Sequence, residues 1–173
     1  MTSDLDRRAF VRGTAMLTGV GLLAGCSGGG DGGGGEDGDG GEGGDGSGDA
    51  ETTESSQDVS EFVGASSNYD GRTVVMTGQD EVTVSVGADG NGGAFAFDPP
   101  AVKVSTGTTV VWEWTGDGGA HNVKSKGDGP LDSGSAVTGS GTTYEYTFEE
   151  AGTYLYYCVP HESLGMKAAV VVE

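Results

Sequence analysis

The chain has 173 residues, which is enough for one domain of ordinary size. It carries 27 acidic residues against 8 lysines and arginines, for a formal net charge of -19 at pH 7. This acidic excess leaves no basic stripe to neutralise phosphates, so nucleic acid is excluded as an expected partner.

The chain begins with the pattern of an export signal. A twin-arginine motif, Asp6-Arg7-Arg8-Ala9-Phe10, precedes an apolar run over residues 15–24 that is too short to span a bilayer. The run ends in Leu23-Ala24-Gly25-Cys26, which resembles a lipobox. Residues 1–25 are therefore predicted to be a twin-arginine lipoprotein signal peptide, with Cys26 lipidated. The alternative is an unpaired thiol beside a signal peptide.

Residues 26–58 consist almost entirely of Gly, Asp, Glu, Ser and Thr. Such a segment cannot bury enough apolar surface to offset its ordering entropy, so it is predicted to be a disordered acidic linker. Together, lipid and linker predict a peripheral protein tethered to the outer face of the cell membrane. The acidity is typical of a surface adapted to high salt; a dedicated docking patch is the alternative.

Residues 59–173 show a period of two with turn punctuation, which predicts strands rather than helices. In the segment ending at Trp114, for example, Val110, Trp112 and Trp114 share one face. Several short strands within about 115 residues predict an all-β sandwich or barrel. The expected strands are Val82–Val86, Val102–Val104, Thr108–Trp114, Thr143–Phe148, Thr153–Cys158 and Ala168–Val172, with a weakly signalled helical turn over Ser60–Ala65.

Four residues have the side chains of a metal site. Cys158, His161 and Met166 lie within nine residues near the C-terminus, and His121 lies well upstream. A thiolate and two imidazoles with a weak axial thioether are the ligands of blue-copper electron-transfer sites. A structural zinc site more often shows four Cys and His ligands in short pairs, and Met166 is a poor ligand for zinc. The set therefore predicts one copper ion in the domain.

Strand parity places Cys158 on the same face as Tyr154 and Tyr156, which we expect to point into the core. A loop beyond that strand would carry His161 and Met166, and His121 would approach from a separate turn. Two neighbours are expected to support the ligands. Asn122 could brace the loop by hydrogen bonds to the Cys158 side, and Pro160 removes a backbone donor and stiffens the loop.

With these motifs, residues 67–173 resemble the cupredoxins of the plastocyanin group, and among them the halocyanins of halophilic archaea. The resemblance implies a Greek-key β-sandwich and carries the copper ligands over to His121, Cys158, His161 and Met166. One departure is Ala168, where plastocyanin-like sequences often have glycine. The segments that carry the resemblance are Phe95–Pro100, Gly107–Trp114, Ala120–Val123 and Gly152–His161, continuing through Gly165-Met166.

The resemblance also implies a function: a one-electron carrier that exchanges electrons with membrane redox proteins. Electrons would pass through the exposed edge of His161, with Leu164 and Gly165 in a small apolar docking patch and Tyr157 as a second exit. Four protein ligands leave no open position for a substrate, so no enzymatic activity is expected. We expect a monomer.

Two other functions use the same sequence differently. A copper chaperone or storage protein on the cell surface would need exchangeable metal, typically held by Met- and His-rich stretches, whereas this chain has only two histidines. A metal-free adhesion sandwich would bind no copper at all. Stoichiometric, slowly released copper would distinguish the electron carrier from both.

Overall fold

The structure is a computed structural model, and it describes residues 50–173. The predicted signal peptide, Cys26 and most of the predicted linker lie outside these residues. Within them, no helix is long and apolar enough to cross a membrane.

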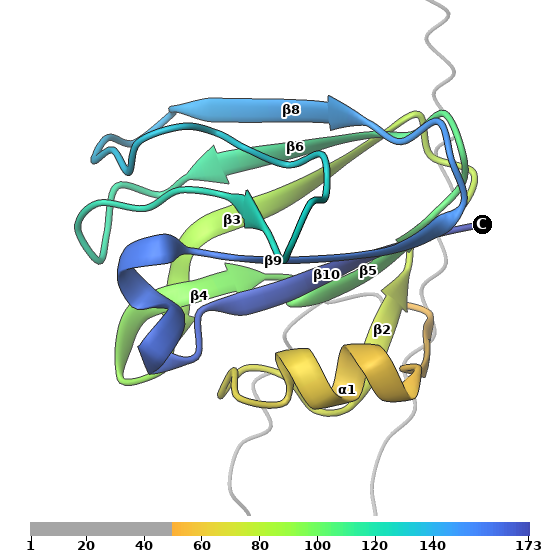
Figure 1. Ribbon diagram of the computed structural model, residues 1–173, viewed down its shortest axis with the longest axis horizontal. Helices are drawn as coiled ribbons and strands as arrows, with labels where there is room; N and C mark the ends of the chain where they lie inside the picture. Colours follow the sequence, from red (N-terminus) through yellow and green to blue (C-terminus); the bar gives the residue numbers. More distant parts are fainter. Residues whose placement is uncertain (1–49) are drawn as a thin grey trace, which may run out of the picture. The chain divides into compact units, whose positions relative to one another are not determined.

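Two β-sheets pack face to face, as Figure 1 shows. The first sheet has six strands in the order β1 (Thr52–Glu54), β2 (Arg72–Val75), β5 (Ala101–Val104), β10 (Lys167–Val172), β9 (Gly152–Tyr157) and β7 (Lys124–Ser125). The second has four, in the order β4 (Gly93–Asp98), β3 (Glu81–Gly90), β6 (Thr109–Trp114) and β8 (Thr143–Thr147). The β-sandwich expected from the sequence is confirmed, and each of the six expected strands overlaps an observed one.

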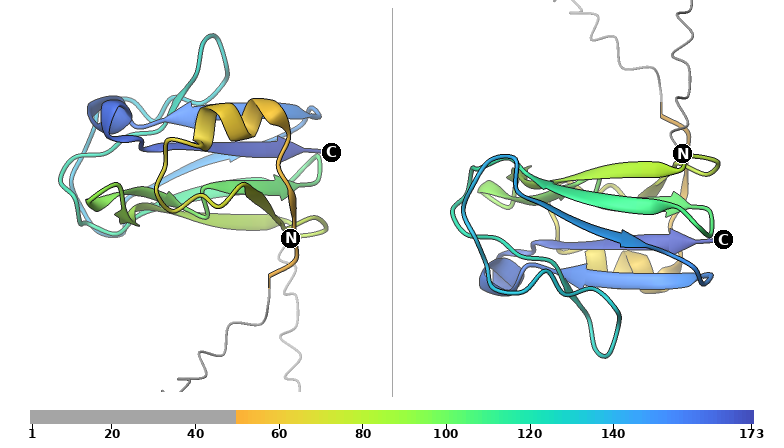
Figure 2. Two further views of the ribbon diagram at one scale, coloured as in Figure 1. Left: turned by 90° about the horizontal axis from the view of Figure 1, so that it is seen from below. Right: turned by 90° about the horizontal axis from the view of Figure 1, so that it is seen from above.

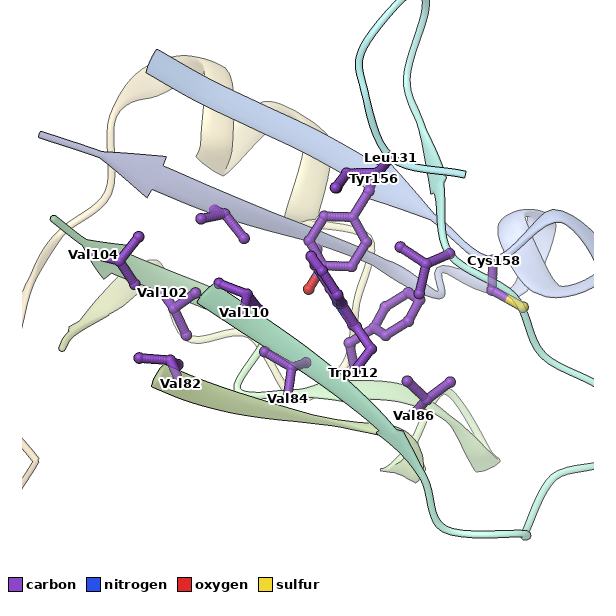
Figure 3. Close-up of a cluster of buried hydrophobic side chains, with 14 of the residues drawn as sticks. Val82, Val84, Val86, Val102, Val104, Val110, Trp112, Leu131, Tyr156 and Cys158 are labelled. Carbon is purple, nitrogen blue, oxygen red and sulfur yellow. The ribbon is translucent and has the colours of Figure 1, made fainter. Parts of the chain in front are cut away.

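The alternating pattern places one apolar face of each sheet in the core between them. In β6, Val110, Trp112 and Trp114 are buried in this core while Glu113 is exposed. Figure 3 shows Trp112 and Tyr156 at the centre of the cluster. Burying a large apolar side chain stabilises a fold by about 1.5–3 kcal/mol, so this core is the main stabilising feature of the domain.

A single α-helix among the described residues, α1 (Gln57–Val63), packs on the outer face of the six-stranded sheet, below β10 in Figure 1 and in front of the sheet in the left view of Figure 2. The Ser56 side chain caps its first turn by accepting a hydrogen bond from the Val59 N–H. Its apolar stripe, Val59, Phe62 and Val63, is buried against Ala101 and Ala169.

Regular secondary structure is therefore present before the expected boundary at residue 59. Strand β1 and the first turn of α1 lie within the stretch expected to be linker. The sequence did not predict β1 because Thr52–Glu54 contains no apolar residue. The strand is stabilised by antiparallel pairing to β2. The helical turn expected at Ser60–Ala65 is real, but it starts three residues earlier, at Gln57.

Candidate metal centre

Cys158 follows the last residue of β9, where the strand leaves the sandwich. Tyr156 and Cys158 are both fully buried in the core between the sheets, whereas Leu155 and Tyr157 face α1 on the outer side. The parity prediction is thus confirmed. Figure 3 shows the Cys158 sulfur at the edge of the cluster, directed away from the valines and toward the loops.

A 3-10 helix, η1 (Val159–Leu164), connects β9 to β10 where a plain hairpin loop was expected. Three backbone hydrogen bonds link the three expected ligands of this connection to one another. The Cys158 N–H donates to the Met166 carbonyl at 3.1 Å, the His161 N–H to the Cys158 carbonyl at 3.1 Å, and the Met166 N–H to the His161 carbonyl at 3.2 Å. The backbone alone therefore fixes the spacing of these residues.

His121 arrives from the segment between β6 and β7. Its backbone exchanges two hydrogen bonds with Val137, each at 3.0 Å, and its carbonyl accepts a third from the Trp114 indole at 3.1 Å. The ring nitrogen Nε2 lies 2.9 Å from the Asp117 carbonyl oxygen. A carbonyl only accepts hydrogen bonds, so Nε2 carries the proton and Nδ1 is left with a free lone pair.

The donor atoms of His121, Cys158 and His161 all lie within 4.8 Å of one another. The Cys158 Sγ is 3.7 Å from Nδ1 of His121 and 3.5 Å from Nδ1 of His161, and the two nitrogens are 3.1 Å apart. Donor atoms that share one ion at about 2.0–2.3 Å have separations of this size. One thiolate, two imidazoles and a nearby thioether fit one type 1 copper ion, and Met166 is fully buried beside them.

Burial controls the protonation of all three donors in the metal-free protein. It lowers the pKa of His121, an effect that the hydrogen bond to Asp117 partly offsets. It also lowers the pKa of His161, as does the neighbouring His121. Burial raises the pKa of the Cys158 thiol, although backbone hydrogen bonds from Asn122 and His161 act in the opposite direction. The histidines are thus neutral and ready to bind, while a metal must displace the thiol proton.

Asn122 joins the two chain segments that bring the ligands together. Its side-chain oxygen accepts a hydrogen bond from the Val159 N–H at 2.8 Å, and its amide nitrogen donates to the Gly134 carbonyl at 3.0 Å. Pro160 lies in the first turn of η1, where its missing N–H costs no helical hydrogen bond. Both residues therefore border Cys158 and the loop that follows it.

The sequence-based surface assignments are only partly matched. His161 is partly exposed and Leu164 is 47% exposed, so both reach the surface beside the donor cluster. Gly165 was expected there as well, but it is buried because its α-carbon faces the Ala65 carbonyl. Gly165 is therefore not part of the exposed docking patch that the sequence predicted. Tyr157 is half-buried on the outer face of the sheet, partly covered by the α1 cluster.

Sequence reasoning missed the role of four residues around the histidines. The Phe95 ring packs on His161 with 4.7 Å between ring centroids and a tilt of 41° between the ring planes. The Asp117 carbonyl orients His121, and Gly87 and Gly118 leave the space for this contact: a Cβ would lie 3.2 Å from Nε2 of His121 at Gly87 and 2.8 Å from it at Gly118. A glycine inside an otherwise regular strand, such as Gly87 in β3, is the available sequence signal for a close approach.

Known proteins resemble this chain over the region that contains the donor cluster. Residues 82–173 match a family model described as copper binding proteins of the plastocyanin/azurin family. Halocyanin from Natronomonas pharaonis is 48% identical over 171 residues, which cover 98% of this chain and 99% of that protein. Plastocyanin from Scenedesmus fuscus is 35% identical over 101 residues, covering 54% of this chain and all of that protein. The structure of a mutant plastocyanin of a fern is 28% identical, with a TM-score of 0.44 over 53% of this chain and all of that one.

Proposed function

The chain belongs to the plastocyanin/azurin family of copper-binding proteins, and from this membership and the donor cluster we propose that it is a membrane-tethered one-electron carrier. The observation that carries the proposal is the convergence of one sulfur and two nitrogen donors within 4.8 Å. A bound type 1 copper ion supplies a Cu(II)/Cu(I) couple that accepts and returns one electron.

The protein's part is to hold the donors in one arrangement. His121 is fixed by three backbone hydrogen bonds and by its ring contact with Asp117. Cys158, His161 and Met166 are fixed by the bonds that they make to one another. None of these bonds uses the donor atoms that face the centre, so a bound ion in either oxidation state can leave all of them intact. Little atomic movement then accompanies electron transfer.

Electron exchange with a partner is proposed to occur at the partly exposed edge of His161. The Phe95 ring packs against His161, and Leu164 is exposed three residues further along the same loop. Both side chains provide apolar contact for a partner. Tyr157, which precedes Cys158 in the chain, is proposed as a second route by which electrons leave, on the outer face of the sheet. The partners are proposed to be membrane redox proteins, one donor and one acceptor, met by a monomeric carrier.

The N-terminal segment is proposed to determine where the protein is located. Twin-arginine export, a lipid on Cys26 and an acidic linker would tether the domain to the outer face of the cell membrane, in keeping with the near full-length similarity to halocyanin. The acidic surface is proposed to be an adaptation to high salt. Mass spectrometry of the mature N-terminal peptide tests the lipid directly: the wild type should carry the added mass of a lipid on Cys26, and Cys26→Ser should not.

The burial of the centre favours an electron carrier over a copper chaperone or storage protein. Cys158 and Met166 are fully buried and His121 is 1% exposed, so only His161 offers a route for a competing ligand. A chaperone needs a site from which copper leaves quickly. Rapid transfer of copper from this protein to a chelator would favour the chaperone instead.

Copper loading of the purified full chain tests the function. With one equivalent of Cu(II), the wild type should turn intensely blue through thiolate-to-copper charge transfer, and the colour should bleach and return over repeated one-electron cycles. Cys158→Ser should remove the colour, because it removes the thiolate. A colourless wild-type complex, or blue colour that survives in Cys158→Ser, would refute the proposal.

A further inference from the structure

The short segment after α1 contacts both chain segments that border the exposed side of the metal centre. We propose that Ala65–Asn68 and Asn91, together called the brace, are positioning residues that hold the metal-binding loop and the β3–β4 hairpin in place. Ala65–Asn68 lies outside the region that matches the copper-binding family, which begins at residue 82. The proposal deepens the proposed function, and its electrochemical test rests on that function.

The first contact of the brace is with the metal-binding loop itself. Gly165 ends η1 with φ 99°, in the left-handed region, and its N–H donates back to the Glu162 carbonyl at 3.1 Å. Its α-carbon lies so close to the Ala65 carbonyl oxygen that any Cβ would overlap that oxygen. The same Cβ would be 3.1 Å from Oδ1 of Asn91. The residue directly before Met166 is therefore enclosed by the brace on its outer side.

The second contact is with the β3–β4 hairpin, through Asn91. Its backbone N–H donates to Oγ of Ser67 at 2.5 Å, and its side-chain Oδ1 accepts from the Ser67 N–H at 2.8 Å. Its side-chain Nδ2 donates to the Phe95 carbonyl at 2.7 Å. Asn68 adds a bond to the same strand, from its Nδ2 to the Phe97 carbonyl at 2.9 Å.

These contacts reach the metal centre by short routes. Phe95, whose carbonyl is held by Asn91, packs its ring in a tilted arrangement against His161. Gly165, which is enclosed by Ala65 and Asn91, is covalently bonded to Met166. The brace thus restrains the ring that packs on one imidazole ligand and the backbone next to the thioether ligand. Loosening it should change the ligand geometry as well as the stability of the fold.

Asn91 offers a substitution that removes the brace contact and keeps the turn. Its φ of 56° is in the left-handed region, which glycine adopts without strain. Asn91→Gly should therefore preserve the hairpin backbone while deleting the three side-chain bonds to Ser66, Ser67 and Phe95. Ser67→Ala independently removes the acceptor of the Asn91 N–H. Thr109→Ala is the matched control, because it removes a 2.8 Å side-chain bond to Thr147 between β6 and β8, in the same four-stranded sheet as the hairpin but without any of the brace residues.

Two measurements on the full chain test the proposal. The first is amide hydrogen exchange at Gly165 and Met166 in the metal-free protein, which should be about tenfold faster in Asn91→Gly and in Ser67→Ala. The second is the reduction potential of the copper-loaded protein. We expect a change of at least threefold in the ratio of Cu(I) to Cu(II) affinity, which is about 28 mV at 59 mV per tenfold change for one electron.

Thr109→Ala should leave both measurements at their wild-type values even where it lowers the melting temperature. The proposal is overturned if neither brace variant changes exchange and potential together, or if Thr109→Ala changes them equally. Should Asn91→Gly fail to fold, Ser67→Ala decides. If the wild type forms no blue copper centre, the proposed function fails, while exchange in the metal-free chain still decides whether the brace holds the loop.

Discussion

The turn before His121 contains two adjacent glycines. Substituting each in turn distinguishes the effect of backbone strain from the effect of displacing a metal ligand. Gly118 and Gly119 both have left-handed backbones, with φ of 74° and 89°. A Cβ on Gly119 would meet no atom within 4 Å. A Cβ on Gly118 would overlap the Ala94 carbonyl oxygen and lie 2.8 Å from Nε2 of His121. Substitution by alanine therefore has one shared effect and one that is specific to Gly118.

The shared effect is the cost of a left-handed alanine, about 1–2 kcal/mol. Gly118→Ala must in addition move either the β4 backbone at Ala94 or the His121 ring. Displacing the ring breaks its 2.9 Å bond to the Asp117 carbonyl, which is worth about 1 kcal/mol. Overpacking of a well-packed site adds about 1–3 kcal/mol. We expect a loss of about 1–2 kcal/mol in the free energy of unfolding for Gly119→Ala and about 3 kcal/mol or more for Gly118→Ala.

Urea unfolding of the metal-free full chain measures these losses, and copper titration with visible spectroscopy measures the effect on the centre. Gly119→Ala should keep the wild-type spectrum and copper affinity. Gly118→Ala should bind copper more weakly and with an altered charge-transfer band, because Nδ1 of His121 is displaced. Equal losses of stability for the two variants, together with two unchanged spectra, would show that Gly118 is not needed to position His121.

Three further perturbations test separate parts of the structure. Asn122→Ala removes two hydrogen bonds and should lower the free energy of unfolding by about 2 kcal/mol; chemical denaturation measures this, and a loss below about 0.5 kcal/mol would contradict it. Phe95→Leu keeps apolar bulk but removes the ring packed on His161, a contact worth about 0.5–1.5 kcal/mol, so copper should dissociate to a chelator roughly two- to tenfold faster; an unchanged rate counts against the packing argument. Asp132→Asn tests the surface ion pair between Lys124 and Asp132. The hydrogen bond from Lys124 lowers the pKa of Asp132, so the contribution of the ion pair to stability is present above the unfolded pKa of 3.8 and is lost as the pH falls through the folded pKa. The wild type should therefore be the more stable protein at pH 7 and lose this advantage below pH 3.8, as thermal melts across that range would show; a difference independent of pH would rule the ion pair out.

The sequence predicted the six strands with the clearest alternation and missed β1, β2, β4 and β7, although β4 buries Ala96 and Phe97. β6 and β9 alternate cleanly, and their inward residues, such as Trp112 and Tyr156, are buried as expected. β7 has only two residues, Lys124 and Ser125, so it has no period to detect. β1 is polar throughout and exists only by pairing to β2. Local patterns cannot report on strands of this kind, because their stability comes from a neighbour distant in sequence.

The candidate site divides in a similar way. The residue types and the parity of β9 were sufficient to place Cys158 at the inner face, because a strand has a strict period of two. The surroundings of the site depend on long-range contacts: Phe95 reaches His161 from another sheet, and Gly165 is buried by Ala65, a residue one hundred positions earlier in the chain. For this reason Gly165 was wrongly expected at the surface. A glycine before a ligand indicates a turn, but it does not indicate which segment packs against that turn.

The hydrogen bonds around the centre explain how one fold can serve two oxidation states. His121 is oriented by the Asp117 carbonyl and the Val137 backbone, and the other three ligands are spaced by bonds among Cys158, His161 and Met166. All of these bonds are made by the chain alone, so the conformational entropy of ordering the ligands is lost when the protein folds and not when metal binds. A change of oxidation state that moved the backbone of a ligand would then have to break one or more of these bonds, and turning the His121 ring would break its bond to the Asp117 carbonyl. Because each hydrogen bond costs about 1 kcal/mol or more to lose, the backbones of the ligands and the His121 ring should keep their positions in both oxidation states.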